Sequence, residues 1–141
     1  MSPILLRFAL ALWFGGGLAV LLGTRSIFRS AADRRQGGFF SGAVLASFLS
    51  LRWVAVALTA IACAFARPSP ALWAAAAAVL TIVHAPLDLR IRALREQLGG
   101  STEGLAADDP RRKRWGALHG ASVLLLLAQI ACGAAGLLAA G

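Results

Sequence analysis

Four long apolar runs constrain this chain more than any other feature of its sequence. A helix needs about 20 mostly apolar residues to cross the hydrocarbon core of a bilayer, and each run is at least that long. We predict helices over residues 3–28, 40–66, 70–97 and 110–140, joined by short loops. The sequence therefore predicts a single all-α transmembrane domain, residues 1–141, folded as an up-down four-helix bundle.

The composition excludes the other broad classes of protein. Apolar residues make up 59% of the chain and charged residues 14%, whereas soluble proteins carry about 25% charged residues. Disordered chains are poor in apolar residues, and two cysteines are too few for a disulfide scaffold. A net charge of +8 would suggest nucleic acid in a soluble domain, but here the basic residues lie between apolar runs and indicate membrane topology.

Basic residues are concentrated on one side of the predicted membrane domain. Because cytoplasmic loops carry an excess of Lys and Arg, we expect loops 29–39 and 98–109 in the cytoplasm and both termini outside, in the inner (plasma) membrane of a bacterium. Gln36, Gly37 and Gly38 are expected to break the chain before the second helix. The basic residues on the cytoplasmic side are Arg25, Arg29, Arg34, Arg35, Arg90, Arg92, Arg95, Arg111, Arg112, Lys113 and Arg114.

Arg52 lies inside the second apolar run, about 21 Å from its outer end at about 1.5 Å per residue. An arginine at mid-membrane costs about 2.5–3.5 kcal/mol, so a partner is expected. Asp88, at about 27 Å, is the only acidic residue near membrane depth, and we predict an ion pair with Arg52. Three interpretations remain open: a structural pair that fixes helix packing, a substrate or ion site, or an arginine that extends to the membrane surface.

His84 and Asp88 are four residues apart and therefore lie on one face of the third helix, close to Thr81. Pro86 lies between them and is expected to kink the helix and release a backbone carbonyl one turn earlier. This arrangement is interpreted either as a binding site beside a kink or as a histidine that hydrogen-bonds within the bundle.

The last apolar run carries a polar face. His119, Ser122 and Gln129 fall on one broad face by steps of about 100° per residue, and we expect this face to point into the bundle. Gly116 and Gly120 have the spacing that permits close approach of a neighbouring helix. The face is interpreted either as helix-packing contacts or as part of a polar site.

Gly15, Gly16 and Gly17 in the first run are also expected to let a neighbouring helix approach closely. They lie near the depth of Arg52, to which Trp13 could offer its ring as a cation–π partner. Together these features predict an interior polar site. Its members are Arg52, His84, Asp88 and His119, supported by Arg25, Thr81, Ser122 and Gln129.

Two other groups of residues invite a chemical interpretation. The basic run 111–114 is interpreted as a topology signal. It can also hold anionic lipid headgroups, with a binding free energy of about 1 kcal/mol per basic residue. Cys63 and Cys132 differ in estimated depth by several ångström, and we expect both to be unpaired. The sequence shows no metal-ligand spacing and no pairing of a nucleophile with a base, so no catalytic or metal site is predicted.

Three segments carry a family resemblance: Leu12–Gly17, Pro86–Glu96 and Arg114–Ser122. The most specific is the aromatic-Gly-x-Leu-His-Gly-x-Ser start of the last helix. They resemble the transmembrane-protein-205-like family (domain of unknown function 4149) over nearly the whole chain, which implies a small four-helix membrane protein with no established chemistry. A fainter resemblance extends to membrane proteins of the copper-resistance-D type, some of whose relatives use intramembrane histidines in redox roles.

Two functional hypotheses follow. The first is a non-enzymatic membrane protein that binds a partner or lipid, or handles a small solute, through the interior polar site. Anionic lipids, a second copy of the chain or another membrane protein are its expected partners. The alternative is a redox protein in which His84 or His119 meets haem or quinone. The two histidines differ by about 10 Å in estimated depth, which is poor geometry for ligating one haem iron from both sides.

Overall fold

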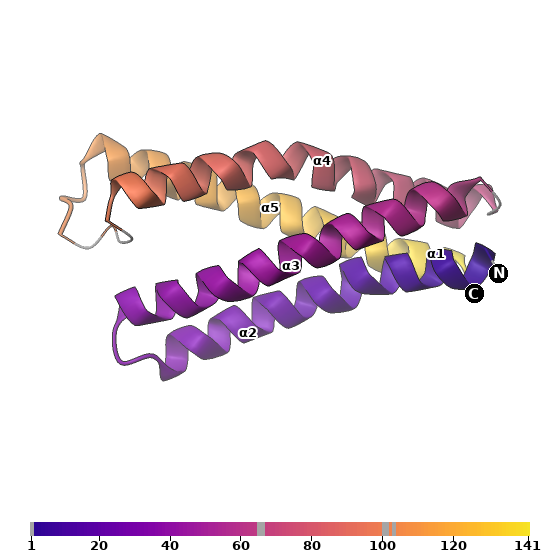
Figure 1. Cartoon of the computed structure of the whole chain (residues 1–141), viewed down its shortest axis with the longest axis horizontal. Coiled ribbons are helices and arrows are strands. Elements are labelled where there is room, and N and C mark those ends of the chain that lie inside the picture. Colours follow the sequence, from indigo (N-terminus) through magenta and orange to yellow (C-terminus); the bar gives the residue numbers. More distant parts are fainter. Residues whose placement is uncertain (1, 65–66, 100–101, 103) are drawn as a thin grey trace.

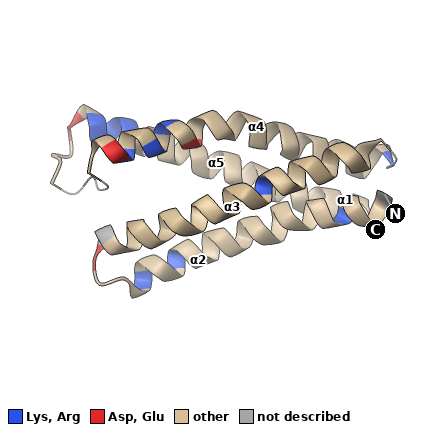
Figure 2. Cartoon of the chain, viewed as in Figure 1, with Lys and Arg blue, Asp and Glu red and all other residues tan. Residues whose placement is uncertain are grey.

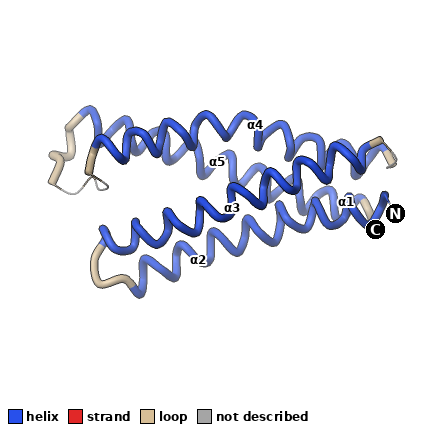
Figure 3. The backbone as a smooth tube through the Cα atoms, in the orientation of Figure 1, coloured by secondary structure: helices blue, strands red, loops and turns tan. Residues whose placement is uncertain are grey.

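The computed structural model of the protein describes residues 2–64, 67–99, 102 and 104–141. Over these residues the secondary structure is entirely helical, which confirms the all-α class. The elements are α1 (Ser2–Ala11), the π-helical segment η1 (Leu12–Gly16), α2 (Gly17–Ser30), α3 (Arg34–Cys63), α4 (Pro68–Gln97) and α5 (Pro110–Ala139). The first three elements form one continuous span, because no loop separates them (Figure 3).

The spans form two antiparallel helical pairs (Figure 1). The first span lies beside α3, and α4 lies beside α5. The two pairs converge at the end that carries both termini and diverge toward the end that carries the longer loop (Figure 1). We call these the closed end and the open end. Basic segments gather at the open end of α4 and α5 (Figure 2).

The helices have the length and composition of membrane spans. Within the described residues four of them are long and apolar enough to cross a bilayer. Large apolar side chains also point outward along every span, among them Ile4, Leu51, Leu89 and Leu124. Such an apolar exterior suits lipid rather than water. The protein is therefore an integral membrane protein.

Helix α3 begins earlier than the sequence indicates, and the expected break at Gln36–Gly38 is wrong. Asp33 caps the helix by accepting a hydrogen bond from the Gln36 amide at 2.6 Å. Gly37 lies within α3 and is buried against Phe28 of α2. The cap and this packing outweigh the low helix propensity of glycine, about 1 kcal/mol per residue. The expected end of this helix at residue 66 lies outside the described residues.

The closed end is packed with small side chains. Leu6, Leu10 and Trp13 of the first span pack against buried alanines of α3 and α4. Gly133 of α5 lies so close to the first span that a Cβ there would sit 2.8 Å from the backbone nitrogen of Phe14. Near the two termini Arg7 donates a hydrogen bond to the carbonyl of Ala140, which joins the first span to the end of α5.

The glycines predicted to mediate helix packing divide into two groups. A Cβ at Gly16 would approach Phe48 to 2.7 Å and one at Gly17 would approach Ile130 to 2.4 Å, so close packing is confirmed there. Within the described chain the same prediction is wrong for Gly15, Gly116 and Gly120, where a Cβ would meet nothing within 4 Å. These three residues face away from the other described helices, and their spacing alone does not identify a partner.

Candidate functional site

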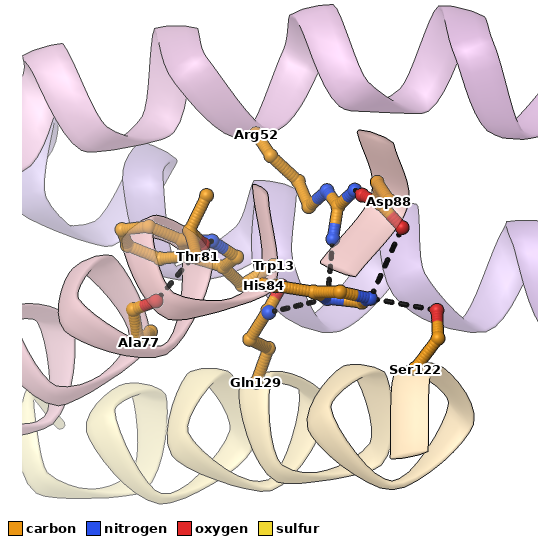
Figure 4. A network of polar contacts seen from close by, with 8 residues as sticks. All are labelled: Trp13, Arg52, Ala77, Thr81, His84, Asp88, Ser122 and Gln129. Carbon is orange, nitrogen blue, oxygen red and sulfur yellow. Dashed lines mark hydrogen bonds and ion pairs between the residues drawn. The ribbon is translucent and has the colours of Figure 1, made fainter. Parts of the chain in front are cut away.

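A network of polar side chains connects α3, α4 and α5 in the middle of the bundle (Figure 4). The predicted ion pair is confirmed: Arg52 Nη2 lies 2.6 Å from Asp88 Oδ2. Both residues sit on long helices whose apolar exteriors place them within the membrane-spanning stretch. This ion pair therefore joins the two antiparallel helical pairs, called the two hairpins from here on, across their interface.

His84 lies at the centre of this network (Figure 4). Its Nδ1 accepts hydrogen bonds from Arg52 Nη1 at 2.7 Å and from Gln129 Nε2 at 3.1 Å. A guanidinium can only donate, so Nδ1 carries no proton and the ring proton is on Nε2. This N–H donates to Ser122 Oγ at 2.7 Å, with Asp88 Oδ1 at 3.3 Å. Each ring nitrogen is therefore engaged inside the bundle.

The charges of the network cancel. A guanidinium and a carboxylate flank a neutral imidazole, which is the arrangement that low-dielectric surroundings tolerate. Arg52 is 5% exposed and His84 is 2% exposed. Within the described part of the chain, the Nε of Arg52 and the Oε1 of Gln129 have no hydrogen-bond partner. The network is thus largely buried, with the Asp88 side chain 18% exposed, and most of its polar atoms are satisfied from within.

A second polar contact lies next to the network, toward the closed end. Trp13 donates from its indole nitrogen to Thr81 Oγ1 at 3.2 Å, and Thr81 donates to the carbonyl of Ala77 at 2.9 Å. The sequence suggested Trp13 as a cation–π partner for Arg52, but Trp13 instead forms this hydrogen bond with Thr81. Phe48 is the cation–π partner: its ring centroid lies 5.5 Å from the guanidinium carbon. Its position four residues before Arg52 on α3 was a readable signal.

His119 and Arg25 do not join this network. The His119 ring instead stacks on Trp115, with 4.9 Å between the ring centroids. His119 and Arg25 line a cavity at the open end, and His84 does not. The predicted interior site is thus two separate features. Shared ligation of one haem iron would require His84 to give up a hydrogen bond that its ring already makes.

The cavity at the open end has a volume of about 750 Å³. It lies between the two hairpins, with walls from α2, α3, α4 and α5 and from the loop before α5. Among its lining residues are the basic side chains of Arg25, Arg95 and Arg112. The rest of the lining is mostly apolar, including Val20, Leu45, Val123 and Leu126.

One wall of the cavity is shaped by glycines of α3. A Cβ at Gly42 would lie 2.7 Å from Nη1 of Arg95, and one at Gly38 would lie 3.2 Å from Nη2. The Arg95 guanidinium therefore reaches from α4 to the surface of α3. Ser41, between these glycines, is 5% exposed and also lines the cavity. Its hydroxyl has no hydrogen-bond partner among the described residues.

The basic run at the start of α5 does not act as a unit. Arg111 forms an ion pair with Asp109 at 2.8 Å, and its hydrogen bonds lower the pKa of that carboxyl. Arg112 faces the cavity and donates to the carbonyl of Leu105 at 3.0 Å. Lys113 and Arg114 are exposed and lie outside the cavity lining.

Sequence reasoning missed the roles of Ser41 and Arg95. The small residues Gly38, Ser41 and Gly42 share one face of α3, but periodicity alone does not show what fills the space beside them. Cys63 and Cys132 are unpaired, as predicted. Over the described residues, His, Cys, Asp and Glu side chains form no group of three able to hold a metal ion.

Comparisons with known proteins identified no relative. No family model matches the chain, and searches of curated proteins and of solved structures gave no match.

Proposed function

We propose that the chain is a binding protein of the bacterial inner membrane that takes up a small organic anion in the open-end cavity. In this proposal the basic loops 29–39 and 98–109 face the cytoplasm and both termini face outward, as the distribution of Lys and Arg favours. Membership of the transmembrane-protein-205-like family is part of the same proposal. It rests on the segments that resemble that family.

The observation that carries the proposal is the lining of the cavity. Three arginines from three different helices meet around a space of about 750 Å³, within the range of about 300–1,000 Å³ typical of small-molecule sites. Arginine recognises carboxylate and phosphate through paired N–H donors. The remaining walls are mostly apolar, which is typical of sites that bind organic molecules rather than bare ions.

The buried network supports a different role. Apart from Arg52 Nε and Gln129 Oε1, its donors and acceptors are used among themselves, and Arg52 and His84 are at most 5% exposed. A ligand would have to break several of these contacts to bind there. We therefore assign the network to holding the two hairpins together, and ligand binding to the cavity.

Fluorescence of Trp115, which lines the cavity, tests the proposal. Trp53 and Trp73 are exposed on the outer surface, so both are replaced by Phe. The remaining Trp13 is buried and serves as a constant background. The protein in neutral detergent is titrated with hexyl phosphate and with hexyltrimethylammonium.

The proposal expects a saturable change in Trp115 emission with hexyl phosphate only. Replacing Arg112 by Gln should weaken the response, whereas the same change at the neighbouring Lys113, which lies outside the cavity lining, should not. Equal responses to the anion and the cation, or no response to either, would contradict binding of an organic anion.

A further inference from the structure

We infer that the occupant of the open-end cavity is a single anionic phospholipid. Its headgroup lies among the arginines, and the upper part of one acyl chain lies along the apolar wall. This inference rests on the proposed function and names the class of its ligand.

The cavity changes from basic to apolar with depth. At about 1.5 Å per residue, Arg112 lies about 3 Å from the open end of α5, whereas Val123 and Leu126 lie about 20 and 24 Å from it. A water-soluble anion would occupy only the basic part and leave the apolar part unfilled. A molecule with an anionic head and a hydrocarbon chain matches both parts.

The basic part offers donors of more than one kind. Arg25 reaches the cavity from α2 and Arg112 from α5, on opposite hairpins. Ser41 is buried on α3, and its hydroxyl is unpartnered among the described residues. A buried hydroxyl without a partner is costly, and a phosphate or ester oxygen in the cavity would satisfy it. The lining contains no Asp or Glu among the described residues.

Exposed apolar side chains form part of the cavity rim. Phe28 is 51% exposed and Leu45 is 40% exposed, yet both contribute to the cavity lining. In this inference these side chains border the bilayer as well as the cavity and give an acyl chain an uninterrupted apolar path between them. In the proposed orientation this rim lies in the cytoplasmic leaflet, where anionic lipids are attracted by basic residues near the surface.

The test uses the whole chain with Trp53 and Trp73 replaced by Phe, in nanodiscs of phosphatidylcholine and phosphatidylglycerol at one fixed composition. Bromine atoms, which quench tryptophan, are placed on the upper acyl carbons of either the zwitterionic or the anionic lipid. Only the position of the label differs between the samples. Trp115 lines the cavity and reports the lipid beside it.

We expect the label on phosphatidylglycerol to quench Trp115 more than the same label on phosphatidylcholine. Arg112→Gln and Arg25→Gln should each reduce the preference for the anionic lipid about fivefold, the equivalent of about 1 kcal/mol per basic residue near the membrane. Ser41→Ala should reduce it by a smaller factor. Lys113→Gln, outside the cavity lining, is the matched control and should retain the preference.

Two results would overturn the inference. One is equal quenching by the two labelled lipids, and the other is an equal loss of preference in Arg112→Gln and Lys113→Gln, which would indicate a diffuse surface attraction. If hexyl phosphate still changes Trp115 emission in detergent, only the lipid inference fails. If, in addition, hexyl phosphate and hexyltrimethylammonium give equal responses in detergent, the proposed function fails as well.

Discussion

The closed and open ends are built from the same four spans but differ in how their helices meet. At the closed end alanines and glycines let the backbones approach, as at Gly133, and buried apolar side chains form a core. At the open end the hairpins diverge around a cavity with basic residues in its lining. The Arg52–Asp88 network lies between the two ends. An apolar span can therefore pack against its neighbours in one half and line a cavity in the other.

The largest expected effect comes from breaking the network. Asp88→Leu leaves the Arg52 guanidinium without its carboxylate, which should lower the free energy of unfolding in detergent by about 3–5 kcal/mol. The double variant Arg52→Leu/Asp88→Leu contains no unpaired buried charge and should be more stable than Asp88→Leu alone. Arg25→Leu at the open end is the control and should change stability by less than about 0.5 kcal/mol.

Denaturant unfolding followed by circular dichroism measures these differences. If Asp88→Leu and Arg25→Leu are equally stable, the network does not hold the hairpins together.

A matched pair of glycine substitutions in α5 tests the packing difference. Gly133→Ala would place a Cβ 2.8 Å from a backbone nitrogen and 3.0 Å from a backbone carbonyl oxygen of the first span. It should destabilise the protein by about 1–3 kcal/mol, the usual cost of overpacking. Gly120→Ala meets nothing within 4 Å and should be neutral or stabilising. Thermal unfolding of both variants measures this difference. A larger loss of stability for Gly120→Ala than for Gly133→Ala would reverse the assignment of the two ends.

The contact between Trp13 and Thr81 should contribute a smaller amount. Thr81→Val keeps the shape of the side chain but leaves the buried indole N–H without its acceptor. The expected cost is about 1–2 kcal/mol, since an unsatisfied buried donor is penalised. Thr102→Val, in the loop before α5, is the control. A blue shift of Trp13 emission should accompany the loss, and its absence would show that this hydrogen bond is not formed.

The smallest effect concerns pH and the cap of α5 at the open end. The hydrogen bonds from Arg111 lower the pKa of Asp109 below its ordinary value. Because the folded-state pKa is depressed, the stabilisation is present above the unfolded pKa and is lost as the pH falls through the folded pKa. Asp109→Asn should therefore differ from the natural protein above about pH 4 and converge with it in more acidic solution. Melting temperatures between pH 2.5 and pH 6 check this, and a constant difference over that range would contradict it.

The sequence predicts the spans and the central ion pair because both depend on counting along one dimension. Run length identifies the four helices, and rise per residue brings Arg52 and Asp88 to similar depth. Interactions between elements are less accessible. Gly37 continues α3 because of a cap and the packing of Phe28. His119 lies one turn from Ser122 yet lines the cavity, whereas Ser122 joins the network. The sequence does not show this separation, because the divergence of the hairpins leaves no periodic pattern in it.

Water access on either side of the network distinguishes a packed closed end from a hollow open end. The natural cysteines Cys63 and Cys132 are replaced by Ala. A single cysteine is then introduced at Thr24, which lines the cavity, or at Thr59, which is 3% exposed at the closed end. Each variant in membranes opened to both sides reacts with a water-soluble maleimide. We expect rapid modification at position 24, slowed by hexyl phosphate, and none at position 59 until the protein unfolds. Equal rates at the two positions would show that the closed end is as open to water as the cavity.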